Sequence, residues 1–459
     1  MAGSDPNAQA PEPNLARCRV FAGSLHAGVD ATVIAFGRAV ESLMGHRADA
    51  GDHLEAALAA DPNLVAAHLL RGFALRTLGR RDLMPGIRAA LAAAESSMKE
   101  CGVGAREQAL FDALKSWSGG CGPKAADILD RRLADEPCDL LLIKLAHAIR
   151  FMLGDCAGML ESLAKVVPAF SEGDDGLGFV LGCRAFALEE VGEFEAAEAT
   201  ARHGLDLEPR DAWGLHALVH VHFERGEAAA GLSSLAANES RFEGLNNFAG
   251  HLAWHEALFQ VEQSRPAFAL DLYDRRIAIY PPRDYRDFSN ASSLLILLEG
   301  RGLDLVARWK ALATIARERF HDHGSAFADL HYVLALAASG RREEASRFVA
   351  AMRRTSLARA ERAKDRGRDH HDARVSLEVG IPVSEAIVEA CLGRRDRARA
   401  QLGAFAGSTR RLGGSRAQRR VLDWVMQDPE ARSAQKPNRP GPDPDCVANA
   451  GSASQGSQE

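Results

Sequence analysis

The chain has 459 residues, of which 46% are hydrophobic and 26% are charged, and its net charge is −6. This balance excludes wholesale disorder, and the charge argues against a protein that binds nucleic acid through bulk positive charge. No stretch reaches the roughly 20 apolar residues of a membrane span. The first residues lack a secretory signal pattern, so we expect a cytoplasmic protein without a membrane partner.

The two ends are predicted to be disordered tails, because residues 1–16 and 428–459 lack apolar periodicity. Residues 17–427 between them are expected to form one helical-repeat solenoid. The charged segment near 355–375 is predicted to be an exposed insertion or a solvated helix. The eight cysteines are scattered without a CxxC pair, so neither a disulfide framework nor a cysteine zinc site is expected.

The segment between the tails has a helical pattern. Apolar residues recur at intervals of three and four, for example in 64–79 and 179–192. A glycine follows helix after helix, where a left-handed backbone favours a residue without a Cβ. These glycines are Gly79, Gly192, Gly226, Gly340 and Gly393.

The spacing of small residues indicates repeats. Gly192 and Gly226 are 34 residues apart, and so are Ala197 and Gly231. Two unit ends read ALAADP (57–62) and GLDLEP (204–209), and Ser264 stands where the pattern expects glycine. A period of 34 is typical of tetratricopeptide repeats, which are pairs of antiparallel helices. We therefore predict an all-α superhelical solenoid of antiparallel helix pairs, with a generic helical bundle as the alternative.

Longer segments resemble the tetratricopeptide repeat protein 38 family. They are RDAWGLHALVHVHFERG (210–226), GHLAWHEALFQVEQ (250–263), ALDLYDRRI (269–277), LLEGRGLDLVARW (297–309), HDHGSAFADLHYVLAL (321–336), GIPVSEAIVEACLGRR (380–395) and RRLGGSRAQRRVLDWVM (410–426). The resemblance covers about residues 20–427 and implies a single cytosolic all-helical solenoid, but no particular activity. Members of that family usually carry a carboxylate near the position that Asn290 occupies here.

Four histidines form two pairs in neighbouring predicted repeats. His216 and His220 are four residues apart, as are His251 and His255. This interval places both imidazoles of a pair on one helix face, where they can share a metal. The segment HLAWHE differs from the HExxH motif, so a metalloprotease is not expected.

The repeat frame places further residues on the inner surface. When Gly226, Ser264 and Gly300 take the same position in their units, the polar and aromatic residues of successive first helices line one concave groove. The candidate ligand-binding residues are Trp213, His216, His220, His251, Trp254, His255, Asp287, Asn290 and His331. Two of these, His255 and His331, fall one position away from the groove positions.

Three interpretations of the four paired histidines remain open. They can be core residues, as we expect for His222 and His323. They can line a binding groove for a peptide, a protein or a small polar ligand, which is the leading functional prediction. They can also bind a divalent metal or transfer protons in an enzyme, with Glu256, Asp287 or Asp329 as an additional ligand or orienting group. No cofactor is predicted under the leading interpretation, and a scaffold role and a homodimer are further possibilities.

The glycine-rich, basic segment LGGSRAQRR (412–420) also has two interpretations. It can be a loop that docks the final helix, or an anion site built from Arg416, Arg419 or Arg420. Few aromatic residues accompany the late arginines, so we expect no nucleic-acid partner.

Overall fold

A computed structural model describes residues 14–25, 29–279, 282 and 284–427. These residues are folded almost entirely as helices, and they contain no strand beyond one isolated bridge between Arg47 and Leu245. None of the described helices is both long and apolar enough to cross a membrane. The predicted all-α class is confirmed.

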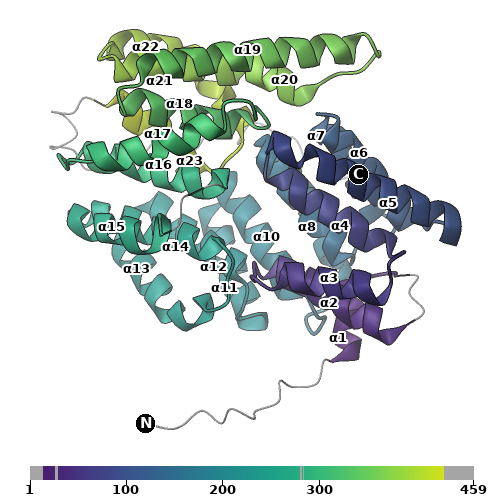
Figure 1. Ribbon diagram of the computed structural model, residues 1–459. Coiled ribbons are helices and arrows are strands. Elements are labelled where there is room, and N and C mark those ends of the chain that lie inside the picture. The colour runs from purple at the N-terminus through teal and green to yellow at the C-terminus, as the bar shows by residue number, and fades with distance from the viewer. Residues whose placement is uncertain (1–13, 26–28, 280–281, 283, 428–459) are drawn as a thin grey trace, which may run out of the picture.

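The first half of the array runs from α1 to α13 (Figure 1). Its α-helices are α1 (Leu15–Ala22), α2 (Asp30–Met44), α3 (Ala50–Ala60), α4 (Val65–Thr77), α5 (Met84–Cys101), α6 (Ala105–Ser118), α7 (Gly122–Leu133), α8 (Leu140–Leu153), α9 (Cys156–Val166), α10 (Leu177–Glu190), α11 (Phe194–Leu207), α12 (Ala212–Arg225) and α13 (Ala228–Ala237). Short 3-10 turns are η1 (Arg81–Leu83), η2 (Val167–Ala169) and η3 (Glu239–Phe242).

The second half continues to α24 and includes two π-helical turns, η4 and η5. Its elements are α14 (Phe248–Glu262), α15 (Pro266–Leu272), η4 (Tyr273–Ile277), α16 (Tyr285–Glu299), α17 (Val306–Glu318), α18 (Ala326–Ala338), α19 (Arg342–Lys364), α20 (His371–Val375), η5 (Ser376–Gly380), α21 (Ile381–Cys391), α22 (Arg395–Gly403), η6 (Ala406–Leu412), α23 (Arg416–Arg419) and α24 (Val421–Met426).

Consecutive helices pack as antiparallel pairs, and the first helices of neighbouring pairs pack on one another. The pairs include α10 with α11, α12 with α13 and α14 with α15, while α10, α12, α14, α16 and α18 form the continuous inner layer. The array is therefore a solenoid of helix pairs, as predicted.

Glycine and small residues shape the units as the sequence indicates. Gly192 and Gly226 have φ of 90° and 78°, and Ser264 takes the same left-handed region with φ of 60°. Ala197 is fully buried, and a Cβ on Gly231 would lie 2.2 Å from the Phe259 ring. Gly231 thus lets α13 approach α14, the first helix of the next pair, closely.

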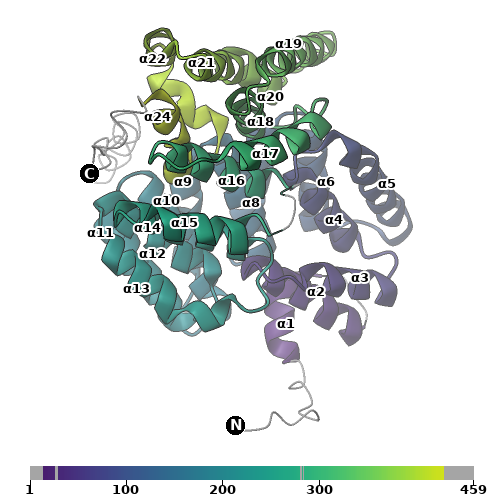
Figure 2. The same cartoon turned by 60° about the vertical axis from the view of Figure 1, so that its left-hand side comes forward.

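The curved array brings its first units against its last ones. An Arg76 nitrogen lies 2.8 Å from a carboxylate oxygen of Asp372, and the Asp372 amide donates to the Gly120 carbonyl at 3.2 Å. Figure 1 shows α6 and α7 of the first half near α20 of the second half, and Figure 2 shows α6 and α20 from another side. The inner surface is consequently enclosed by helices from both halves of the chain.

Two predicted segments take a more definite form. Helix α1 begins at Leu15, inside the predicted N-terminal tail of residues 1–16, whereas residues 1–13 and the predicted C-terminal tail, 428–459, lie outside the described part. The charged segment near 355–375 forms the end of α19, a short connection and α20. Ser356 in α19 donates to the Ser376 hydroxyl at 2.9 Å, so the end of α19 is anchored to the body.

Candidate metal centre

The two histidine pairs meet at the boundary between α12 and α14. The Nε2 atoms of His216 and His251 lie 2.9 Å apart, and the ring centroids of His220 and His255 lie 4.6 Å apart. Each of the four side chains offers one nitrogen, and these nitrogens all lie within 4.8 Å of one another. The structure thus gathers four potential metal ligands in one place.

Hydrogen bonds to neighbouring helices orient two of these rings. His220 Nδ1 lies 3.2 Å from a Glu189 carboxylate oxygen, and His251 Nδ1 lies 3.1 Å from the Asn290 carbonyl oxygen. A ring that donates from Nδ1 presents the Nε2 lone pair on its other side. Glu189 and Asn290 therefore favour the tautomers of His220 and His251 that carry the proton on Nδ1. In these tautomers the Nε2 atom of each ring can bind a metal.

Several ring nitrogens in the cluster are buried without a hydrogen-bond partner. Among the described residues, His220 Nε2 and both nitrogens of His255 have none. Both side chains are fully buried. An unpaired buried polar atom costs about 1–3 kcal/mol, and a bound cation would remove this cost.

Burial keeps three of the four imidazoles neutral. Burial, with a smaller contribution from the charge of nearby His220, lowers the pKa of His251 to about 3. Burial and the neighbouring histidines also hold the pKa values of His216 and His255 well below the ordinary value. Burial alone would lower the pKa of His220 as well, but the charge and hydrogen bond of Glu189 outweigh burial and raise it. Neutral imidazole is the form that binds metals.

A second group of three possible ligands shares His220. Oxygens of Glu189 and Glu190 and a nitrogen of His220 also lie within 4.8 Å of one another. Glu190, however, already accepts from the backbone amide of Arg416 at 2.7 Å and pairs with the Arg419 guanidinium at 3.4 Å. The four-histidine group is the better candidate metal centre.

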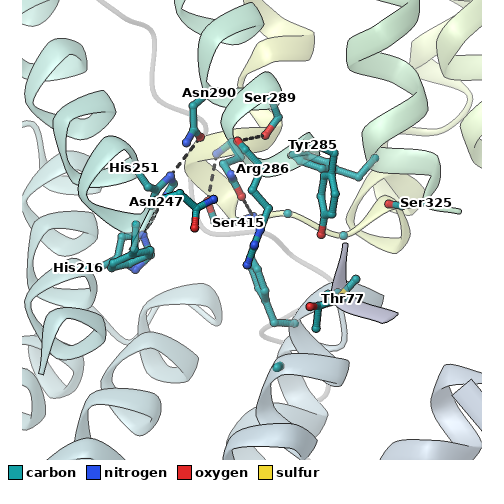
Figure 3. Close-up of a pocket in the computed structure, with 18 of the residues that line it drawn as sticks. Thr77, His216, Asn247, His251, Tyr285, Arg286, Ser289, Asn290, Ser325 and Ser415 are labelled. Atoms are coloured by element: carbon teal, nitrogen blue, oxygen red, sulfur yellow. Dashed lines mark hydrogen bonds between the residues drawn. The ribbon is translucent and has the colours of Figure 1, made fainter. Parts of the chain in front are cut away.

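A cavity of about 170 Å³ lies against this centre. His216 and His251 line it, whereas His220 and His255 lie behind them. Figure 3 shows His216, His251 and Asn290 on one side and Tyr285, Thr77 and Ser325 on the other. The complete lining is His46, Thr77, Lys144, His147, Ala148, Phe151, Met152, Trp213, His216, Asn246, Asn247, Phe248, His251, Tyr285, Arg286, Ser289, Asn290, Ser325, Phe327, Leu412, Gly413, Gly414, Ser415 and Gln418.

The other predicted groove residues lie in different surroundings. Trp213 lines the cavity and donates from Nε1 to His147 Nε2 at 3.1 Å. Trp254 stacks on His251 outside the cavity lining and donates to the Ser293 hydroxyl at 3.1 Å. Asp287 accepts from Asn247 at 3.0 Å, and burial followed by the charge of Asp284 raises its pKa to about 6.

His331 lies outside the cluster. Its Nδ1 lies 2.9 Å from the Ser292 hydroxyl, and burial lowers its pKa to about 3. His222 and His323 lie beside the carboxylates of Glu227 and Asp329, at 2.8 and 3.4 Å.

Different acids from those expected surround the histidines. Glu256 pairs with Arg276 at 3.1 Å, and Asp329 lies beside His323, so the orienting carboxylate on the cluster is Glu189. The helix before the cluster, α10, ends with Glu189 and Glu190. A carboxylate at the end of the preceding first helix is the signal that could have identified Glu189.

Several residues that line the cavity lie on distant helices and are not among the groove residues predicted from the sequence. Lys144 and His147 on α8, His46 after α2, and Phe248 at the start of α14 all line the cavity. Lys144 and His147 interrupt the apolar run of LLLIKLAHAIRFML, and both are buried. Buried polar residues in an otherwise apolar helix were the available signal.

The late arginines act as a docking element. Arg416 and Arg420 lie 3.3 and 3.2 Å from the Glu224 carboxylate, and Arg419 pairs with Glu190. Residues Leu412–Ser415 of the same segment line the cavity. Because these guanidinium groups face carboxylates at the ends of α10 and α12, the geometry favours the docking interpretation over an anion site.

Comparisons with known proteins add no family. No family model matches the chain, and no solved structure matches it.

Proposed function

We propose that this protein is a metal-dependent enzyme that acts on a small polar molecule in the cavity beside the four histidines. His216, His220, His251 and His255 hold the metal. The observation that carries the proposal is the convergence of four imidazole nitrogens within 4.8 Å of one another. An unpaired buried nitrogen is not by itself evidence of a metal site, because His331 outside the cluster also has one.

The ligand set favours a transition metal. Imidazole suits zinc, copper, iron and nickel. In a tetrahedral zinc site with bonds of 2.0–2.1 Å, neighbouring ligand atoms lie about 3.3 Å apart. The 2.9 Å between His216 and His251 needs only a small expansion to reach this value. Four imidazoles would complete a tetrahedral site, so a metal that takes five or six ligands leaves room for a substrate.

The position of the cavity indicates the side from which a substrate would reach the metal. His216 and His251 form the side of the cluster that borders the cavity, while His220 and His255 lie on the buried side. A metal between them can polarise an oxygen of a molecule in the cavity as a Lewis acid. The small volume and the contacts between first and last units favour a small molecule over an extended peptide.

Proton transfer by the histidines alone is a weaker alternative. A general acid or base works best when its pKa lies near the working pH. The pKa of His251 is about 3, and those of His216 and His255 are also well below the ordinary value. The pKa of His220 is raised, but this ring is buried and does not line the cavity. These rings are better suited to binding a metal than to exchanging protons.

Elemental analysis of untagged protein, purified without chelators, tests the proposal. We expect near-stoichiometric transition metal in the wild type and in His331→Ala, and loss of metal in His255→Ala. Both substituted histidines are fully buried on inner helices, so the pair controls for a lost core side chain. Circular dichroism verifies folding. Equal metal content in the two variants, or none in the wild type, would contradict the proposal.

A further inference from the structure

The cavity beside the candidate metal centre carries positive charge and no acid. Lys144 and Arg286 line it, and none of the described lining residues is aspartate or glutamate. A metal ion on the histidines would add more positive charge. A cavity with this balance attracts an anion.

Of the two cationic side chains among the described lining residues, Lys144 is the one without a carboxylate partner. The residue is 7% exposed, and its ammonium donates to the Met44 carbonyl at 3.4 Å and to His46 Nε2 at 3.2 Å. In the described part of the chain it forms no ion pair, and it lies 5.3 Å from the centroid of the Trp213 ring. An ammonium has three donors, so one is left for a bound molecule.

Arg286 contributes to the same region but is partly neutralised. Its Nε donates to Asp284 at 3.0 Å, and its Nη2 pairs with the same carboxylate. Both cations lie close enough to His46 to lower the pKa of that imidazole, after burial, which is the larger cause. The net charge that these two side chains offer, apart from the metal, is therefore nearer one than two, which at the Lys144 end of the cavity suits a carboxylate better than a phosphate dianion.

Aromatic rings form much of the wall between Lys144 and the histidines. Phe248 stacks on His46 at 4.3 Å and meets the His216 ring at 5.2 Å, while Trp213 lies 4.8 Å from His216. A protein cavity of about 150 Å³ accommodates benzene. The 170 Å³ here therefore fits one aromatic ring and a few further atoms.

We propose that the cavity binds a small aromatic carboxylate, with the carboxylate at Lys144 and the ring against Trp213 and Phe248. This orientation places the far edge of the ring beside His216 and His251. The inference names the substrate class of the proposed enzyme, and in that sense rests on the proposed function, although the Lys144 contact itself requires no metal.

Calorimetric titration with three probes tests this inference: benzoate, its neutral analogue benzamide, and the benzylammonium cation. We expect the holoprotein to bind benzoate at least about tenfold more tightly than benzamide, and benzylammonium least. Lys144→Met should remove the preference for benzoate. Lys115→Met is the matched control, since Lys115 also lies over an aromatic ring, Phe111 at 5.4 Å, but outside the cavity.

Equal affinity for benzoate and benzamide would overturn the inference, as would a benzoate preference that survives Lys144→Met. Benzoate binding that depends on the metal but not on Lys144 would move the carboxylate to the metal and would also overturn it. The wild-type comparison decides even when the variant does not fold. Metal analysis of the same samples separates the two proposals. A Lys144-dependent preference for benzoate in protein that contains no metal contradicts only the proposed function. Protein that contains metal but shows no preference for benzoate contradicts only this inference.

Discussion

His216 Nε2 and His251 Nε2 face each other at 2.9 Å across the boundary between two repeat units. Because the Nδ1 atom of His251 is directed at Asn290, its Nε2 carries a lone pair towards His216. Both rings have strongly lowered pKa values, so neither is charged near neutrality. The pairing of α12 with α14 thus holds two neutral ligands close to the separation of about 3.3 Å that a shared tetrahedral metal requires.

Metal removal should destabilise the folded chain. A metal that binds only the folded state stabilises it by about 2.7 kcal/mol at a free concentration one hundred times its Kd. We therefore expect chelator-treated protein to melt at a lower temperature and to recover when metal is added back. Thermal unfolding by circular dichroism measures this, and His255→Ala should show no change on adding metal. An identical melting temperature with and without metal in the wild type would oppose a site at the cluster.

Glu189 should control metal affinity without touching the metal. Glu189→Gln keeps the shape of the side chain but removes the charge beside His220 Nδ1. Loss of such an orienting partner weakens metal binding by roughly 10–100-fold. Competition with a chromophoric chelator measures the affinity. Glu256→Gln is the control, since Glu256 pairs with Arg276 away from the cluster, and equal losses in both variants would contradict a positioning role.

Metal affinity should rise with pH and then level off. The raised pKa of His220 means that this ring carries an extra proton at and above the ordinary imidazole value of 6.5. Metal bound to His220 Nε2 must displace that proton, whereas His216, His251 and His255 are already neutral. Below the raised pKa we expect roughly tenfold weaker binding per unit decrease in pH. Burial raises the pKa of Glu189 beside His220 to about 7, so Glu189 is the one further group expected to add to the slope. Affinities at several pH values measure the slope, and a dependence on more than two protons would show that another histidine of the cluster titrates.

The helix pairs could be predicted from local sequence, whereas much of the site could not. Gly226 and Ser264 take the left-handed backbone that their places in the repeat require, and the two histidine pairs follow from their spacing of four. The position of Lys144 in the cavity depends on how far the solenoid curves, whereas the contact of Glu189 with His220 joins adjacent first helices. Curvature accumulates small packing angles over many pairs, which no single segment encodes.

Other parts of the sequence analysis stay predictions. The resemblance to the tetratricopeptide repeat protein 38 family, the cytoplasmic location, the homodimer and a scaffold role belong to this group.

Trp213, His216, His251 and Asn290 share one cavity, whereas Trp254 and His331 are fixed by Ser293 and Ser292 outside its lining. The repeat frame identifies the inner helices, but it does not distinguish a side chain that faces the cavity from one that packs between two helices.

The close approach of α10 and α12 should be sensitive to a single methyl group. A Cβ on Gly182 would lie 1.9 Å from an Asp211 carboxylate oxygen and 3.0 Å from the Gly214 Cα. Asp211 caps α12 by accepting from the amides of Trp213 and Gly214 at 3.0 and 2.9 Å. Gly182→Ala must therefore displace the cap or separate the helices, and overpacking of this kind costs about 1–3 kcal/mol.

Because α12 carries His216 and His220, this displacement should also weaken metal binding, and denaturant unfolding with metal titration measures both effects. Gly51→Ala is the matched control: Gly51 also lies within a helix, α3, but an added Cβ there meets nothing within 4 Å. Alanine favours an exposed helix over glycine by up to about 1 kcal/mol, so the control should be neutral or slightly stabilising. If Gly182→Ala matched the control in stability and metal affinity, α10 would not position the histidines of α12.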